Sequence, residues 1–317
     1  MDNTFLYVSI MSSPTDILLT TVQSLMTLLG SITNGFVVVV NVHDWRLGRS
    51  LTSADYFTCS VAVSNLFLQL WSGFSGFYDL FKNSDVFCQS SFTLKMISTH
   101  CSFRVAALLC LFYCTRIVSS KNCLFRFYQR RVQSSFRKAI LRAILSVFFI
   151  GFPLFGIKKE QLTPKSGNLL LNIGSVSFVN NTLIDTSFVL YRIFLLCFGY
   201  IYPLLISLVS AVCLLVSLMK HMNRMRDTME NKDGAFIAAH RRAGTTVMSM
   251  LLLILMYFVT SIISLILLYP HTDPRSVLCD FIAMLYAPAL GIVLIRGNCK
   301  LRKMAAKIQR EVERRMF

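Results

Sequence analysis

Seven long apolar stretches divide this chain, and the gaps between them differ sharply in charge. The stretches cover residues 17–42, 54–78, 86–117, 139–157, 187–219, 244–269 and 276–296. A helix of about 20 apolar residues is needed to cross the hydrocarbon core of a bilayer. The sequence therefore predicts an all-α membrane protein: one seven-transmembrane-helix bundle that occupies residues 1–317.

The basic residues predict how this bundle is oriented. Of the 32 Lys and Arg residues, the gaps on one side, counted with the adjoining ends of the apolar stretches and with the C-terminal tail, hold 2, 8, 6 and 8. The alternate gaps hold 5, and Lys95, Arg104 and Arg192 lie inside apolar stretches. Cytoplasmic loops are enriched in Lys and Arg. We therefore expect the N-terminus outside the cell and the C-terminus in the cytoplasm.

Composition narrows the classes of function. The chain is 55% hydrophobic and 15% charged, which is typical of a membrane protein. The formal charge of +17 lies mainly in short loops beside apolar helices, so membrane lipids are the expected partners and nucleic acid is not. The sequence has no His/Glu metal cluster, no Ser/His/Asp set and no Gly-rich phosphate loop. Neither an enzyme nor a cofactor is expected.

Two segments outside the apolar stretches carry their own predictions. The tail over 299–315 alternates apolar and charged residues at helical spacing, which predicts an amphipathic cytoplasmic helix on the membrane surface. Asn180 begins an Asn-x-Thr sequon in a gap that the charges place outside, and we expect it to be glycosylated. The chain has no repeat of the transporter kind, so a transporter or channel is an alternative rather than the main hypothesis.

Short fragments in several helices follow one another at the spacing of a known receptor family. They are Gly30 with Asn34-Gly35-Phe36 and Asn41, Ala62-Val63-Ser64 with Leu68-Gln69-Leu70-Trp71, Phe112-Tyr113 with Arg116-Ile117, Ser217-Leu218-Met219-Lys220-His221, Ala239-His240, and Gly297-Asn298-Cys299-Lys300-Leu301-Arg302. On these residues the chain resembles the bitter taste receptors (taste receptors type 2), as a divergent member.

This resemblance implies a function. It implies a multi-pass G-protein-coupled receptor in the plasma membrane that binds a bitter small molecule and signals to a heterotrimeric G protein of the gustducin or inhibitory type. A receptor oligomer is a further partner to consider. A vomeronasal type 1-like pheromone receptor is the nearest alternative. The Ser-Leu-x-x-His sequence at the end of the fifth apolar stretch favours the bitter family.

The chain departs from the family pattern at two places. Asn65 stands where the resemblance implies Arg, and Leu290-Gly291 stands where it implies His-Ser. The resemblance connects both places with switching between receptor states.

Ionisable residues inside a bilayer are costly, so they are the first candidates for a ligand site. Lys95 lies at a position where the resemblance implies a Trp on the pocket floor, and Thr99 and His100 follow one turn below. An ammonium there would bind an anion; the alternative is that Lys95 reaches the headgroups. Asp280 in helix 7 is expected either to pair with Lys95 or to share a zwitterionic ligand with it.

Other residues complete the expected sites. Tyr191, Tyr257 and Tyr286 are candidate pocket walls, although packing is the more common role of any single aromatic residue. Arg104 is expected to be an interhelical donor rather than a ligand contact. The resemblance implies G-protein contacts on the cytoplasmic side at Tyr113, Arg116, Arg131, His221 and His240, with attraction to anionic lipid as the alternative role.

Overall fold

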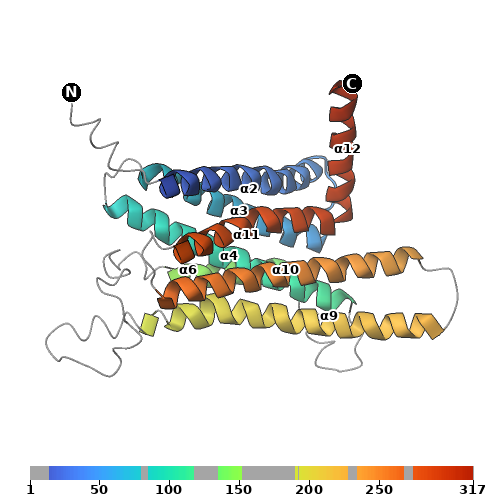
Figure 1. The fold of residues 1–317 in the computed structure, drawn as a ribbon. Helices are drawn as coiled ribbons and strands as arrows, with labels where there is room; N and C mark the ends of the chain where they lie inside the picture. The colour runs from blue at the N-terminus through green and yellow to red at the C-terminus, as the bar shows by residue number, and fades with distance from the viewer. Residues whose placement is uncertain are drawn as a thin grey trace, which may run out of the picture.

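The computed structural model describes residues 14–79, 85–117, 135–151, 190–191, 193–227, 234–267 and 274–316. The described elements are helices that lie side by side along one axis, apart from the last one (Figure 1). In chain order they are α2 (Pro14–Arg46), α3 (Ser53–Asp79), α4 (Asp85–Ile117), α6 (Phe136–Gly151), the π-helix η3 (Leu195–Ile201), α9 (Tyr202–Asp227), α10 (Gly234–Leu267), α11 (Pro274–Gly297) and α12 (Cys299–Met316).

This arrangement is the seven-helix bundle that the apolar stretches predicted, because η3 continues directly into α9 and the two form one helix of the bundle. Within the described residues, four segments are long and apolar enough to cross a membrane by themselves: Thr20–Arg46, Thr93–Arg116, Leu195–Ser217 and Arg242–Ile263. Several helices are longer than their apolar stretches. α9 continues to Asp227 and α10 begins at Gly234, because helical backbone continues through Arg, Lys, Met and Ala, which favour helices.

The connection from α2 to α3 is fixed by local hydrogen bonds. Gly48 adopts a φ of 71°, in the left-handed region, and ends α2. The Arg49 amide donates to Asp44 O and the Gly48 amide to Trp45 O, both at 3.0 Å, which is a Schellman motif. The next helix begins with a capping box, in which the Thr52 amide donates to Asp55 Oδ2 and the Asp55 amide donates to Thr52 Oγ1.

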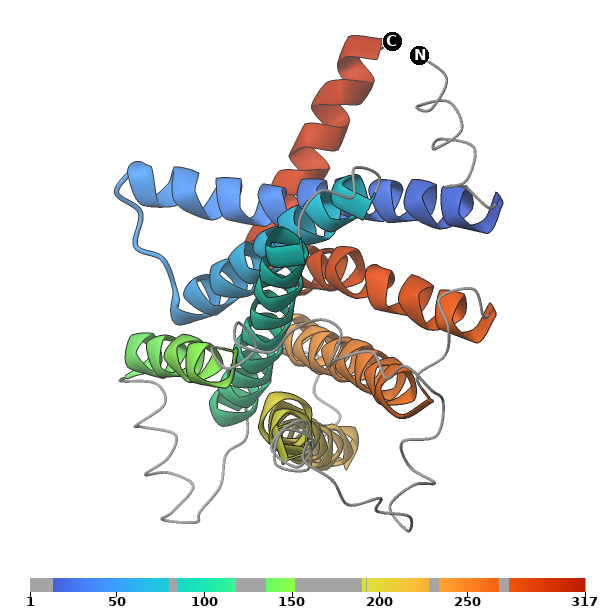
Figure 2. The same cartoon turned by 90° about the vertical axis from the view of Figure 1, so that its left-hand side faces the viewer.

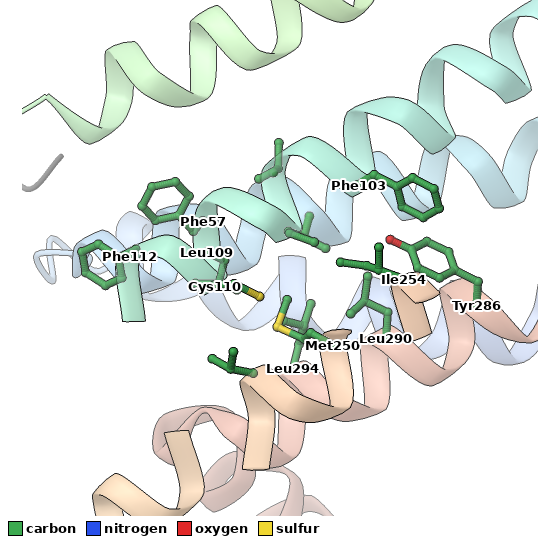
Figure 3. Close-up of a cluster of buried hydrophobic side chains, with 14 of the residues drawn as sticks. Phe57, Phe103, Leu109, Cys110, Phe112, Met250, Ile254, Tyr286, Leu290 and Leu294 are labelled. Carbon is green, nitrogen blue, oxygen red and sulfur yellow. The ribbon is translucent and has the colours of Figure 1, made fainter. Parts of the chain in front are cut away.

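α4 is the central helix of the bundle. It packs against α3, α6, α9 and α10, and Figure 2, which looks along the bundle, shows it among them. The core side chains between α4, α10 and α11 include Leu109, Cys110, Met250, Leu290 and Leu294 (Figure 3).

The outer faces are apolar, whereas many polar side chains face inward. Phe149 is 82% exposed and Val39 66%, but Asn34 and Asn65 are fully buried. Such a distribution suits a protein whose surroundings are lipid rather than water. The chain turns by 98° between α11 and α12, so α12 leaves the bundle roughly at a right angle (Figure 1). We call the end of the bundle that carries α12 the tail end, and the opposite end the Lys95 end.

Candidate ligand and signalling site

Three polar residues follow one another on α4 toward the Lys95 end. Lys95 is half-buried, whereas Thr99 and His100 are fully or almost fully buried. The Thr99 hydroxyl donates to the carbonyl of Lys95 at 2.9 Å, within α4 itself. His100 Nδ1 lies 3.3 Å from Gly199 O, and its Nε2 has no hydrogen-bond partner among the described residues. The His100 Nε2 is therefore a buried polar atom that is available to a further partner.

An aromatic cluster lies deeper in the bundle. The Phe103 ring meets Tyr257 and Tyr286 edge-on, with ring centroids 4.9 Å apart in both cases, and the centroids of Tyr257 and Tyr286 are 5.2 Å apart. Figure 3 shows Tyr286 beside Phe103. These three rings join α4, α10 and α11, so a movement of one helix alters the ring contacts of the other two. Tyr257 and Tyr286, which we expected as pocket walls, are thus brought together.

A buried polar network continues from this cluster to α3 and α2. The Ser102 hydroxyl lies 3.1 Å from the Tyr286 hydroxyl and donates to Asn65 Oδ1 at 2.7 Å. Asn65 Nδ2 donates to Asn34 Oδ1 at 3.0 Å, and Asn34 Nδ2 donates to Ala287 O at 3.1 Å. Four helices are therefore linked through small neutral groups. The amide of Asn65 makes both of its contacts without bringing a charge into the core.

The second departure from the family pattern lies beside this network. Leu290 is fully buried in the core. A Cβ at Gly291 would lie 2.7 Å from Thr33 Oγ1 and 3.0 Å from Asn34 Nδ2. Such distances are too short, so Gly291 is what allows α11 to approach α2 closely here.

Arg104 is held between helices, as the sequence led us to expect. One guanidinium nitrogen donates to Ser146 Oγ on α6, and the other, Nη2, donates to Phe198 O on η3 at 2.8 Å. Its guanidinium carbon lies 5.6 Å from the centroid of the Tyr202 ring. These partners are a hydroxyl, a carbonyl and a ring, so the cation is held by neutral groups, and its buried Nε has no hydrogen-bond partner among the described residues. Tyr191 also packs between helices, because its hydroxyl donates to Ile150 O at 2.6 Å.

A charged cluster that the sequence did not reveal lies at the tail end. Lys300 Nζ contacts Asp44 Oδ2 at 3.0 Å, Asn41 Oδ1 at 2.8 Å and Asp55 Oδ1 at 3.7 Å. Asn298 donates to Asp55 Oδ1 at 3.0 Å. The cluster ties the start of α12 to α2 and α3. The described residues include no group of three or more His, Cys, Asp or Glu side chains that is placed to hold a metal ion.

The residues expected to contact a G protein are only partly described. Tyr113 is half-buried near the end of α4, and Arg116 is exposed, with its guanidinium 5.9 Å from the Phe112 ring centroid. His221 and His240 lie in α9 and α10 and Asp280 lies in α11, but their side chains are outside the described part of the chain. Arg131 and Asn180 are outside the described residues altogether.

Comparison with known proteins identifies the family. The model of the family described as taste receptor protein (TAS2R) matches residues 11–313. The chain belongs to the TAS2R family of taste receptors. It is 27% identical over 290 residues to taste receptor type 2 member 13 of Pan troglodytes, covering 89% of this chain and 93% of the relative. To member 46 of Homo sapiens it is 26% identical over 286 residues, covering 87% of each chain.

A third relative, taste receptor type 2 member 102 of Mus musculus, is 24% identical over 293 residues, covering 91% of this chain and 86% of the relative. As a member of the TAS2R family, the protein is a G-protein-coupled bitter taste receptor and not an enzyme. It is a membrane protein, which agrees with its apolar spanning segments. These findings confirm the family that the sequence fragments indicated.

Proposed function

We propose that this TAS2R receptor binds anionic or zwitterionic bitter molecules at the Lys95 end of the bundle, from outside the cell. The observation that carries this proposal is the order of side chains along α4. A half-buried ammonium, a buried hydroxyl and a buried imidazole, whose unpartnered Nε2 can accept from a ligand N–H or O–H, lie directly above an aromatic cluster. Small-molecule sites are typically apolar with a few polar anchors. Asp280 is the proposed partner of Lys95, or of the ammonium group of a zwitterionic ligand.

The proposed signal is a shift in population between two arrangements of the helices. A ligand shifts such an equilibrium only by binding one arrangement more tightly. Phe103, Tyr257 and Tyr286 lie on three helices, and Tyr286 contacts the polar network at Ser102. A ligand that reorders these rings would therefore alter the packing of α10 and α11 against α4.

At the tail end, the proposed partner is a heterotrimeric G protein of the gustducin or inhibitory type. The basic residues there suit an acidic partner surface. Of the proposed contact set, the structure describes the side chains of Tyr113 and Arg116, and Arg116 is exposed at the end of α4. Arg131, His221 and His240 complete the set. We propose the plasma membrane as the site of action, with Asn180 glycosylated on the outer side.

A ligand screen tests the first part. Cells that express the receptor with a promiscuous G protein would be exposed to bile acids as anionic probes and to quaternary ammonium bitter compounds as cationic probes, with calcium release as the readout. Anionic probes should activate the wild type, Lys95→Ala should abolish these responses, and Lys95→Arg should keep them, at equal surface expression. Activation by cationic probes alone, with unchanged dose–response curves in Lys95→Ala, would contradict the proposal.

The identity of the G protein needs a separate measurement. Agonists from the screen would be applied to cells with biosensors that report dissociation of individual Gα subunits. We expect dissociation of gustducin and inhibitory Gα, and loss of the inhibitory signal after pertussis toxin, which modifies these subunits. A toxin-resistant response through another Gα class would overturn this part while leaving the ligand site intact.

A further inference from the structure

We call the fifth helix of the bundle helix 5; it comprises η3, α9 and the helical residues 190–191 and 193–194 before them. Its π-helical stretch, η3, lies directly before α9. Single wide turns of this kind are rare in helices and often occur at functional sites. Here the amide of Tyr202 donates to Cys197 O, five residues earlier, instead of Phe198 O, four residues earlier. The wide turn therefore changes which carbonyls of helix 5 have a partner within the helix.

Two successive carbonyls lose their usual donors. Phe198 O loses the Tyr202 amide to Cys197, and the residue five positions after Phe198 is Pro203, which has no N–H. Gly199 O would normally accept from the residue four positions later, which is again Pro203. An unpaired carbonyl in the hydrocarbon region is costly. Donors from another helix can take both positions.

α4 supplies both donors. Arg104 Nη2 donates to Phe198 O at 2.8 Å, and His100 Nδ1 lies 3.3 Å from Gly199 O. A carbonyl only accepts, so Nδ1 is the protonated nitrogen of this imidazole. Arg104 and His100 are four residues apart and thus lie on one face of α4. Gly199 makes room for the ring, since a Cβ there would lie 2.6 Å from His100 Cε1.

We propose that Arg104 is a positioning residue that holds helix 5 in its π-helical register. If helix 5 were α-helical here, the Tyr202 amide would bond to Phe198 O and the guanidinium would lose that acceptor. Arginine stays charged in proteins, and this one is only 8% exposed, so the loss would leave a buried cation with fewer partners. Arg104 thus stabilises the wide turn over the regular helix.

The register determines how the two halves of helix 5 face the bundle. One residue corresponds to roughly 100° of rotation in an α-helix. Closing the wide turn would rotate the half that carries Tyr191 relative to the half that carries Ser207. The hydrogen bond from Tyr191 to Ile150 O belongs to the first half, and the one from Ser207 to Pro203 O belongs to the second. Arg104 therefore sets which helix-5 side chains face the Lys95 end of the bundle interior.

A distance measurement along helix 5 tests this proposal without any ligand. Spin labels would be attached through p-acetylphenylalanine at Leu190 and Val209, which are 61% and 60% exposed and lie on either side of the wide turn. The native cysteines stay in place. Double electron–electron resonance in nanodiscs would then compare wild type, Arg104→Leu, Arg104→Lys and Ser146→Ala.

We expect Arg104→Leu to shift the Leu190–Val209 distance by about 3 Å or more, because the two halves rotate against each other. Arg104→Lys keeps a donor for Phe198 O and should retain the wild-type distance. Ser146→Ala removes only the other hydrogen-bond partner of Arg104 and should also leave it unchanged. An unchanged distance in folded Arg104→Leu, or an equal shift in Ser146→Ala, would overturn the proposal.

A second variant covers the case in which Arg104→Leu is not recovered as folded protein. Pro203→Ala restores an N–H that can serve Gly199 O in a regular helix, so it removes one obstacle to the α-helical register. Arg104 still donates to Phe198 O in this variant, so the wild-type distance should persist. A shift in Pro203→Ala would show that the missing N–H of Pro203, rather than Arg104, holds the register, and it would overturn the proposal. Because no agonist is used, failure here and failure of the proposed ligand site are distinguishable.

Discussion

The surroundings of two cations, the buried Arg104 and the half-buried Lys300, differ in a way that follows their place along the bundle. Arg104 in the middle of the bundle contacts a hydroxyl, a carbonyl and an aromatic ring. Lys300 at the tail end contacts the carboxylates of Asp44 and Asp55. A charge pair costs less at the end of a bundle, where water can reach it, than in the middle. In the middle, the cation is instead held by neutral groups that are already part of the helices.

The largest expected effect tests the charged region. Lys300→Ala leaves Asp44 and Asp55, whose side chains are 7% and 9% exposed, without their shared cation. We expect a loss of about 2–3 kcal/mol in stability, reduced because Lys300 is 32% exposed. Thermal unfolding of the purified receptor, followed by a thiol-reactive dye, measures it. Lys300→Arg is the matched control, and equal melting temperatures for Ala and Arg variants would contradict the importance of this cluster.

The next largest loss of stability is expected at Gly291, where α11 approaches α2 closely. Gly291→Ala places a Cβ 2.7 Å from Thr33 Oγ1, so α11 must move away from α2 at a cost of about 1–3 kcal/mol. Gly35→Ala is the control, since a Cβ there would meet no atom within 4 Å. Both variants add one methyl group to a helical glycine. We expect thermal unfolding to separate them clearly, and equal stability would show that the close approach of α11 and α2 is unimportant.

A smaller effect is expected at the junction of rings and polar network. Tyr286→Phe removes the hydroxyl that lies 3.1 Å from Ser102 Oγ but keeps the edge-on contact of the ring with Phe103. Ser102 keeps its bond to Asn65, so the expected loss is about 1 kcal/mol. Ser102→Ala should cost more, because it also removes the donor to Asn65. The reverse order in unfolding temperature would show that the network is not continuous through Ser102.

The smallest effect returns to the tail end. Arg49 pairs with Asp44 at 2.9 Å, but its side chain is 65% exposed. Exposed ion pairs contribute little, so Arg49→Ala should lower stability by about 0.5 kcal/mol or less. Comparing it with Lys300→Ala at low and high salt sharpens the contrast: only the small effect of Arg49 should disappear at high salt. A loss of stability in Arg49→Ala as large as that in Lys300→Ala would contradict the small contribution expected of this exposed ion pair.

The fold class was predictable because a bilayer restricts a chain of this kind to a bundle of apolar helices. The ends of the helices were less predictable. Apolar stretches mark the part of a helix that lies in lipid, whereas α10 begins at Gly234, ten residues before its apolar stretch. The amphipathic spacing over 299–315 predicted a helix, and α12 occupies Cys299–Met316.

For the candidate site, the sequence indicated residues but not their partners. The sequence indicated Arg104 as an interhelical donor, yet its acceptor depends on the wide turn of η3, which no local pattern marks. Pro203, four residues after Gly199, has no N–H, so the sequence does indicate that Gly199 O lacks its usual helical donor. The pairing of Lys300 with Asp44 joins residues far apart in sequence, and one sequence read by itself does not reveal such contacts.

The central claim is that the Lys95 end faces the outside of the cell and the tail end faces the cytoplasm. The most direct test places one epitope tag before Met1 and another after Phe317 of the same receptor. On intact cells antibodies should stain the first tag alone, and permeabilised cells should stain for both. Staining of the tag after Phe317 on intact cells would reverse the bundle in the membrane and contradict both the proposed ligand entrance and the proposed G-protein surface.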